Sequence, residues 1–242
     1  MKILILSDIH GNLCAFRAVL NSLSGRRDIE GCVLLGDTVD YGMHSNEVIA
    51  LLKMLPYEIL CNIRGNHEDA IINDSYDRFS SDRGRDSARN TKKNLSDSSW
   101  DYIKNVVTPS GRCEFGIGCK KCLAIHGSLA DEYWKSISPD GDLSGYSEYD
   151  YVFSGHSHLP HFFEKYFKTE NPSTRNRKKT VFINPGSVGQ PRNINNRAQY
   201  AVFDTETEEI ELIKIKYDIE QEQQAFDGSV DEFYKTRLKE GI

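Results

Sequence analysis

Five short segments, each directly after an apolar run, carry side chains that could bind metal ions. The candidate ligands are Asp8, His10, Asp37, Asn66, His126, His156 and His158. A carboxylate has two oxygens and can bridge two cations, which an imidazole cannot do. With Asp37 shared, these seven residues would give each of two ions four protein contacts and leave room for water or a substrate oxygen. The sequence therefore predicts a dinuclear metal site.

The ligand types also indicate the class of metal. Imidazole and carboxylate without thiolate suit transition metals better than Ca²⁺ or Mg²⁺. We expect two divalent ions, with Mn²⁺ as the first choice and Fe, Zn, Ni or Co as alternatives that the ligands also accept. Two such ions would clamp a phosphoryl group and supply a hydroxide for in-line attack at neutral pH.

The spacing within two of the segments explains how their side chains could meet. Asp8 and His10 are two residues apart, as are His156 and His158. On an extended segment, alternate residues face the same way. We therefore expect each pair to reach one metal centre from an extended strand end.

Three further residues are candidates for the chemistry itself. His67 is adjacent to Asn66 and points elsewhere on this reading, so it could protonate the leaving oxygen. Asp40, three residues after Asp37, could hydrogen-bond His67 and favour its charged form. Arg64 could bind a phosphate oxygen bidentately, or form an ordinary surface salt bridge.

The elements that must position these residues are predicted from hydrophobic periodicity and breakers. Strands are expected at 2–6, 31–35 and 57–63, with helices at 10–23 and 46–55 between them. This β-α-β-α-β order predicts a parallel sheet. The second half reads as strands at 112–116, 121–126, 151–154, 159–167, 179–183, 200–204 and 209–217, followed by a helix at 231–240. Polar helices are expected near 86–95 and 98–105.

These motifs resemble the signature blocks of the calcineurin-like metallophosphoesterase superfamily. The blocks are Asp-x-His, Gly-Asp-x-x-Asp, Gly-Asn-His-Glu, His and Gly-His-x-His, and the run from Asn184 to Arg192 resembles compact bacterial and archaeal members related to diadenosine tetraphosphatases. The resemblance implies an α/β fold with four layers, α/β/β/α, and two mixed sheets. It assigns Asp8, His10, Asp37 and His158 to one metal, and Asp37, Asn66, His126 and His156 to the other.

The resemblance makes the chain a phosphoesterase and gives His67 the proton-donor or phosphate-stabilising role, with Asp40 behind it. One alternative is a serine/threonine phosphoprotein phosphatase, in which a phosphate-binding arginine follows the Gly-Asp-x-x-Asp block. Tyr41 stands there instead, which weakens that alternative, and Arg192 could supply the missing charge. The other alternative is a non-catalytic scaffold, although no ligand is missing here.

The substrate is open at this stage. Small phosphate esters or anhydrides are expected, and a phosphoprotein or a nucleic-acid end is possible. Selectivity would lie in residues 73–99, 131–151 and 186–197; the first could be a cap beside the site or a solvated loop. Tyr133, Trp134 and Tyr146 could stack a base or simply pack. The basic run of Arg175, Arg177, Lys178 and Lys179 reads as a hairpin tip.

Composition narrows the class of protein. The chain has 242 residues, 38% hydrophobic and 27% charged, which suits one domain spanning 1–242. A net charge of −6 offers no global field for nucleic acid. No apolar run is long enough for a membrane span or a secretory signal, so we expect a cytoplasmic protein that binds no membrane. Cys113, Cys119 and Cys122 are expected on a hairpin, with a local redox or thiol-metal role as the alternative.

Overall fold

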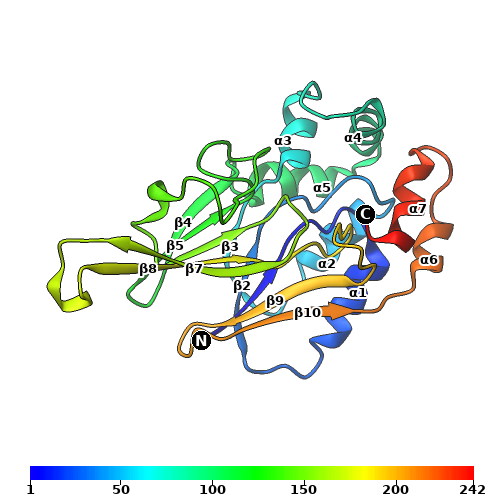
Figure 1. Ribbon diagram of the computed structural model, residues 1–242. Helices are drawn as coiled ribbons and strands as arrows, with labels where there is room; N and C mark the ends of the chain where they lie inside the picture. The colour runs from blue at the N-terminus through cyan, green and yellow to red at the C-terminus, as the bar shows by residue number, and fades with distance from the viewer.

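The computed structural model describes residues 1–242, in which ten strands form two mixed five-stranded sheets that pack face to face (Figure 1). The first sheet has the order β10-β9-β1-β2-β3, with β1 (Lys2–Leu6), β2 (Ile29–Leu34), β3 (Glu58–Asn62), β9 (Ala198–Asp204) and β10 (Ile210–Ile215). The second has the order β4-β5-β6-β8-β7, with β4 (Arg112–Ile117), β5 (Lys120–Ile125), β6 (Tyr151–Ser154), β7 (His161–Lys168) and β8 (Arg177–Asn184).

Each sheet has a parallel centre, which determines where the site lies. In the first sheet β1, β2 and β3 are parallel, and in the second β5, β6 and β8 are parallel. The carboxyl ends of these strands lead into every predicted ligand segment. Antiparallel strands complete the edges of both sheets.

Alternating side chains on β1 divide the core into two layers. Ile3 and Ile5 pack between the sheets against residues such as Phe153 of β6, and all three are fully buried. Leu4 and Leu6 face the opposite way, toward the helices. Period-two alternation in a strand that is buried on both faces is what a sheet between two layers requires.

Helices cover the outer face of the first sheet and the end where the ligands gather. They are α1 (Leu13–Ser22), α2 (Ser45–Leu52), α3 (Asn66–Asn73), α4 (Asp82–Asn94), α5 (Asp97–Asp101), α6 (Ile219–Gln224) and α7 (Glu232–Glu240). The outer face of the second sheet is covered by residues 127–150, whose only regular element is a short 3₁₀ turn at Ser144–Tyr146. The predicted four layers are therefore present, the fourth being mostly loop.

The sequence-based elements are confirmed for all ten strands, and two helices were not foreseen. The structure begins α1 at Leu13, because Asn12 caps it by accepting from the Ala15 amide at 3.0 Å. Neither α3, which starts within a ligand segment, nor the short α6 was predicted. The helix expected at 98–105 is α5 followed by a π-helical turn at Tyr102–Val106.

The last two helices return the chain to the ligand end of the sheets. In Figure 1, α7 lies beside α4, above the ends of the strands. Tyr234 of α7 packs with Tyr41 and Val230 in a small cluster of its own. None of the helices is both long enough and apolar enough to span a membrane.

Candidate active site

The ligand segments leave their strands through backbone turns in the left-handed region. Asp8 and His10 have φ of 53° and 49°, and His156 and His158 have φ of 63° and 57°. This corrects our expectation of extended strand ends: each pair converges because two left-handed residues flank a normal one. Non-glycine residues adopt this region at a cost, and such strain is concentrated at functional sites.

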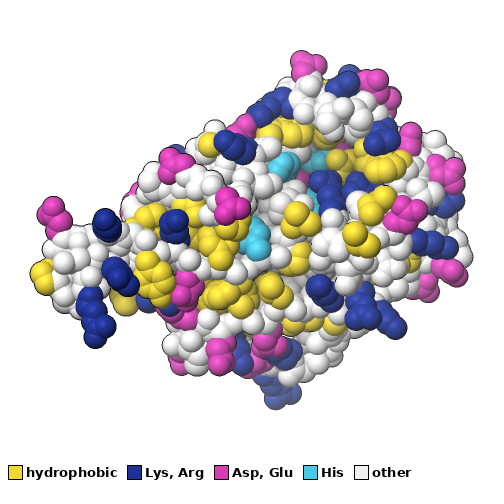
Figure 2. All heavy atoms as spheres, in the orientation of Figure 1, with side chains coloured by type: hydrophobic (Ala, Val, Ile, Leu, Met, Phe, Trp, Pro, Cys, Tyr) yellow, Lys and Arg dark blue, Asp and Glu magenta, His cyan; other side chains and the backbone are white.

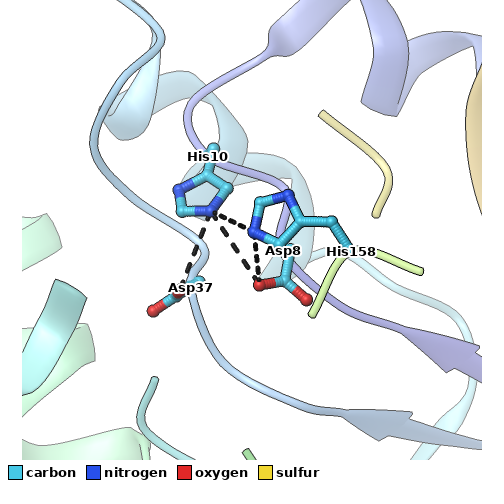
Figure 3. Close-up of side chains that lie close together, drawn as sticks. All are labelled: Asp8, His10, Asp37 and His158. Atoms are coloured by element: carbon cyan, nitrogen blue, oxygen red, sulfur yellow. Dashed lines mark hydrogen bonds and ion pairs between the residues drawn. The ribbon is translucent and has the colours of Figure 1, made fainter. Parts of the chain in front are cut away.

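A first group of four side chains converges at the carboxyl end of β1 (Figure 3). His158 Nε2 lies 3.1 Å from Asp8 Oδ1 and 3.3 Å from His10 Nε2. Asp37 Oδ2 is 3.7 Å from His10 Nε2. All four residues are buried, and Asp8 Oδ1 has no hydrogen-bond donor, whereas Oδ2 accepts from the Ser7 hydroxyl and the His156 amide.

In His10 and His158, the hydrogen bond made by Nδ1 determines whether Nε2, which faces the other ligands, carries a proton. His10 Nδ1 lies 3.2 Å from the Val39 carbonyl, and His158 Nδ1 lies against the Gln190 carbonyl. A carbonyl only accepts, so these bonds place the proton on Nδ1 and leave a lone pair on each Nε2. Two lone pairs and an unpartnered carboxylate oxygen that face one another fit a cation.

A second group lies on the other side of Asp37 and includes the predicted amide. His126 Nε2 is 3.2 Å from Asp37 Oδ2 and 2.9 Å from Asn66 Oδ1. His156 Nδ1 is also 2.9 Å from Asn66 Oδ1. His126 Nδ1 donates to the Leu35 carbonyl at 2.7 Å, which turns its Nε2 toward Asp37 and Asn66. Burial disfavours the charged ring, but Asp37 raises the pKa of His126 to about 9, so without metal Nε2 carries a proton that a bound cation would replace. All seven predicted ligands are thus brought together in two adjoining groups.

Asp37 is the residue that both groups share. Its Oδ2 faces His10 on one side and His126 on the other, while its Oδ1 accepts from the His67 amide at 2.9 Å. Burial alone would raise the pKa of Asp37, but His126 and His67 hold that pKa well below its ordinary value. Burial, with His126 beside it, lowers the pKa of His156 to about 3. The carboxylate is therefore ionised and this imidazole neutral, as metal ligands must be.

A buried carboxylate that the sequence did not single out supports this arrangement. Glu68 is 1% exposed and accepts from the amides of Asp37 at 2.9 Å, Thr38 at 2.6 Å and Gly65 at 2.9 Å. A Cβ on Gly36 would lie 2.3 Å from the Gly65 nitrogen, so the turns after β2 and β3 touch directly. Glu68 thereby ties together the two turns that carry Asp37 and Asn66.

Replacing Glu68 with glutamine is expected to lower the free energy of unfolding of the metal-free protein by about 2–4 kcal/mol. The new amide group would place N–H donors against backbone N–H donors and leave buried donors unpaired. Urea unfolding in EDTA measures the loss. Glu47→Gln, on the exposed face of α2, is the matched control and should change little. An unchanged midpoint for Glu68→Gln would contradict this role.

His67 and Asp40 form a separate pair beside the two metal groups. His67 Nδ1 donates to Asp40 Oδ2 at 2.6 Å, and its Nε2 lies 3.9 Å from Asp37 Oδ2. Burial disfavours the charged ring, but Asp37 and the hydrogen bond to Asp40 raise the pKa of His67 above its ordinary value. The pair therefore holds a proton that Nε2 can present toward the site.

Comparison with known proteins identifies the family to which this geometry belongs. The sequence model of the calcineurin-like phosphoesterase superfamily domain matches residues 1–208. The chain belongs to the calcineurin-like phosphoesterase superfamily. It is accordingly a phosphoric ester hydrolase, and the family signature that the sequence resembles is confirmed.

Individual relatives share the fold over their whole length. The uncharacterized protein MJ0912 of Methanocaldococcus jannaschii is 32% identical over 248 residues, which covers 99% of this chain and 95% of the relative. The crystal structure of a metallophosphoesterase from Sphaerobacter thermophilus is 27% identical, covers 100% of both chains and has a TM-score of 0.76. The hypothetical protein PH1004 of Pyrococcus horikoshii OT3 is 21% identical, covers 100% of this chain and 98% of its own, and has a TM-score of 0.80, which shows the fold alone.

The phosphoesterase has a cleft of about 620 Å³ beside its two groups of candidate metal ligands. Figure 2 shows histidine side chains at the bottom of this cleft and basic side chains next to them. One wall is formed by residues 78–81, 83 and 84, so the polar segment at 73–99 is a cap beside the site. Of the three predicted stacking aromatics, only Trp134 lines the cleft. Tyr146 packs in the core on Phe182, and Tyr133 is half-buried outside the cleft lining.

The structure places the two predicted arginines differently. Arg192 lines the cleft, as its loop suggested. Arg64 does not: its amide donates to the Ser110 carbonyl at 3.2 Å and its Nη2 to the Lys104 carbonyl at 3.5 Å. Both ends of Arg64 are thus held beside the segment after α5, away from the cleft lining. Its contact with phosphate is a prediction that this placement does not favour.

Two hydroxyls that sequence reasoning missed join the cap to the acid pair. Ser87 and Thr91 of α4 donate to Asp40 Oδ1 at 2.6 and 2.9 Å, and the Tyr41 amide donates to the same oxygen at 2.7 Å. Their spacing of four residues on a polar helix, both on one face, was the available signal. The cap of this phosphoesterase therefore holds the carboxylate that orients His67.

Removing both hydroxyls, as Ser87→Ala with Thr91→Val, is expected to lower kcat about tenfold. Asp40 Oδ1 would keep only the Tyr41 amide as a donor and lose the two hydroxyls that fix it from α4, so His67 would be held less firmly. Steady-state hydrolysis of a nitrophenyl ester measures this, with Ser98→Ala on α5 as control. In a His67→Gln background the same pair of changes should have no further effect. Additive losses would show a merely structural role.

Proposed function

We propose that this chain is a dinuclear metal-dependent phosphoesterase that hydrolyses a phosphate ester or anhydride. The observation that carries the proposal is the position of Asp37 Oδ2, which lies 3.7 Å from His10 Nε2 on one side and 3.2 Å from His126 Nε2 on the other, so that Asp37 belongs to both groups of candidate ligands. Asp8, His10, Asp37 and His158 would hold one ion. Asp37, Asn66, His126 and His156 would hold the other.

The donor set suits divalent transition metals, and Mn²⁺ is our first choice among Mn, Fe, Zn, Ni and Co. When bound, two such ions supply Lewis-acid charge for the phosphoryl group and lower the pKa of water to about 7. The protein's own contribution is geometric. Three imidazoles are oriented by main-chain carbonyls, which fixes each ring with Nε2 inward.

His67 is suited to give a proton to the leaving oxygen. His67 lines the cleft, and its Nδ1 is held by Asp40. Because Asp40 is itself fixed by α4 and the Tyr41 amide, the imidazole keeps one orientation. A positioned imidazole of this kind contributes about 10²- to 10⁴-fold as a general acid.

The position after Asp40 argues against the protein-phosphatase alternative. Tyr41 is buried. Its ring stacks on the Tyr234 ring with a centroid separation of 4.3 Å and meets the His67 ring edge-on with a centroid separation of 4.5 Å. The Tyr41 side chain itself offers no cation to a phosphoserine or phosphothreonine. A small phosphate ester is the better fit.

The test is hydrolysis of bis(p-nitrophenyl) phosphate and p-nitrophenyl phosphate by protein loaded with Mn, Fe, Zn, Ni or Co. We expect activity with at least one metal, loss of activity in EDTA and about two ions per chain by elemental analysis. Metal should also raise the melting temperature, because it relieves the facing acceptors. Absence of hydrolysis with all five metals, or one ion per chain in the active protein, would overturn the proposal.

A further inference from the structure

Three arginines in the cleft wall pair with no Asp or Glu side chain. They are Arg83 of α4, Arg192 of the loop after β8 and Arg237 of α7. The neighbouring arginines of the cap are paired: Arg78 with Asp131, Arg85 with Asp82 and Arg89 with Asp86. The three unpaired cations therefore come from three separate parts of the chain and meet in one place.

The contacts of these arginines hold them together in spite of their like charge. The guanidinium carbon of Arg83 lies 3.9 Å from the centre of the Phe233 ring, and that of Arg237 lies 5.1 Å from the same ring. Arg237 is 7% exposed, and its Nε donates to the Ile242 carbonyl. The Nε of Arg192 is buried and has no partner at all.

The arginines of this group affect one another electrostatically. Burial, followed by the neighbouring Arg192, lowers the pKa of Arg237 to about 10, so it still carries its proton at neutral pH. Like charges gathered in a partly buried wall without an acidic side chain beside them are unfavourable, and an anion with several oxygens relieves them. The planar guanidinium fork matches phosphate oxygens bidentately.

The group extends from the metal site toward α7. Arg192 and the ligand His158 line the same cleft. From His10, the rings of Tyr41 and then Tyr234 lead to α7, with centroid separations of 4.6 and 4.3 Å. His67 touches both Tyr41 and Phe79 of the cap. The arginines thus lie on the side of the proton donor, which is the side of the leaving group.

We propose that Arg83, Arg192 and Arg237 bind a second phosphate group of the substrate, on the leaving-group side of the phosphate that is hydrolysed. The substrate class is then a phosphoanhydride, such as a nucleoside di- or triphosphate. Water adds across the P–O–P link: its oxygen joins the phosphorus at the metal site, and the bond from that phosphorus to the bridging oxygen breaks. The bridging oxygen leaves on the second phosphate, with a proton from His67. This inference rests on the proposed phosphoesterase function.

The first experiment compares two inhibitors of bis(p-nitrophenyl) phosphate hydrolysis at fixed free Mn²⁺. Methylenediphosphonate carries two phosphonates and methylphosphonate carries one. We expect Arg83→Gln to raise the inhibition constant of the first by about tenfold or more, and to affect the second much less, because one charge-assisted contact is lost. Arg89→Gln, on the same helix and outside the cleft lining, should change neither.

The second experiment needs no catalysis. Calorimetric titration of the metal-free protein with tripolyphosphate should show binding that Arg83→Gln weakens about tenfold. Arg83 is exposed, so this variant tests the subsite even if Arg237→Gln does not fold. Equal weakening of both inhibitors, or no tripolyphosphate binding by the wild type, would overturn the second-phosphate site. If no ester is hydrolysed, the proposed function fails while the calorimetry still decides this inference.

Discussion

Asp37→Asn is expected to lower kcat/KM for ester hydrolysis by about 10³-fold or more and to reduce the bound metal from about two ions to one or fewer. The shared oxygen, 3.7 Å from His10 and 3.2 Å from His126, is the only carboxylate oxygen that faces both groups. An amide has one neutral oxygen and cannot bridge two cations with charge. A loss of several kcal/mol of transition-state stabilisation corresponds to this factor.

The control for Asp37 separates lost metal from lost fold. In EDTA the melting temperature of Asp37→Asn should lie below that of the wild type, because the charges of His126 and His67 that hold the pKa of Asp37 low would lose their partner. The rise on adding Mn²⁺ should shrink. Asp86→Asn removes an exposed ion pair on α4 and should keep the wild-type melting temperature in EDTA and the wild-type rise on adding Mn²⁺. Two ions and wild-type activity in Asp37→Asn would contradict the shared site.

His67→Gln is expected to lower kcat by about 10²- to 10⁴-fold while both metal ions remain bound. Glutamine can still accept or donate a hydrogen bond, but it cannot deliver a proton to the leaving oxygen. The loss should be larger for an alkyl ester, whose alkoxide is a poor leaving group, than for a p-nitrophenyl ester. Steady-state kinetics on both esters, with elemental analysis, measures this.

The comparison between esters distinguishes two roles for His67. If it only stabilises the phosphoryl oxygens, both esters should lose the same factor. His161→Gln, which changes a histidine on β7 outside both metal groups, should retain activity on both. A loss of less than tenfold on the alkyl ester would remove His67 from the mechanism.

Most of the metal site could be predicted because its information is local. Each ligand, such as Asp8 or His126, follows an apolar run that is a parallel strand, and parallel strands end at one edge of a sheet. Residue type then selects carboxylate, amide and imidazole as ligands. The same reasoning predicted the wrong backbone conformation for Asp8 and His10. The sequence Asp-x-His is compatible both with an extended strand end and with two left-handed residues, so it does not distinguish them.

The surroundings of the site could not be predicted because they depend on packing between distant segments. Arg83 and Arg237 meet over Phe233 only after α4 and α7 have docked. Glu68 accepts from amides more than 25 residues earlier, and a buried carboxylate leaves no periodic pattern. Arg64, by contrast, looked suitable by sequence and is held elsewhere by two main-chain carbonyls.

The left-handed backbone at the ligands has a consequence for how this protein would respond to random mutation. At Asp8, His10, His156 and His158, glycine fits the left-handed backbone better than the native residue does, and it removes a polar side chain that faces other candidate ligands. A selection for resistance to heat or protease in a chelating medium would therefore enrich glycine there. A selection for growth on a phosphate ester would deplete glycine at these positions. Positions at which glycine is enriched by the first selection and depleted by the second would therefore identify the metal ligands.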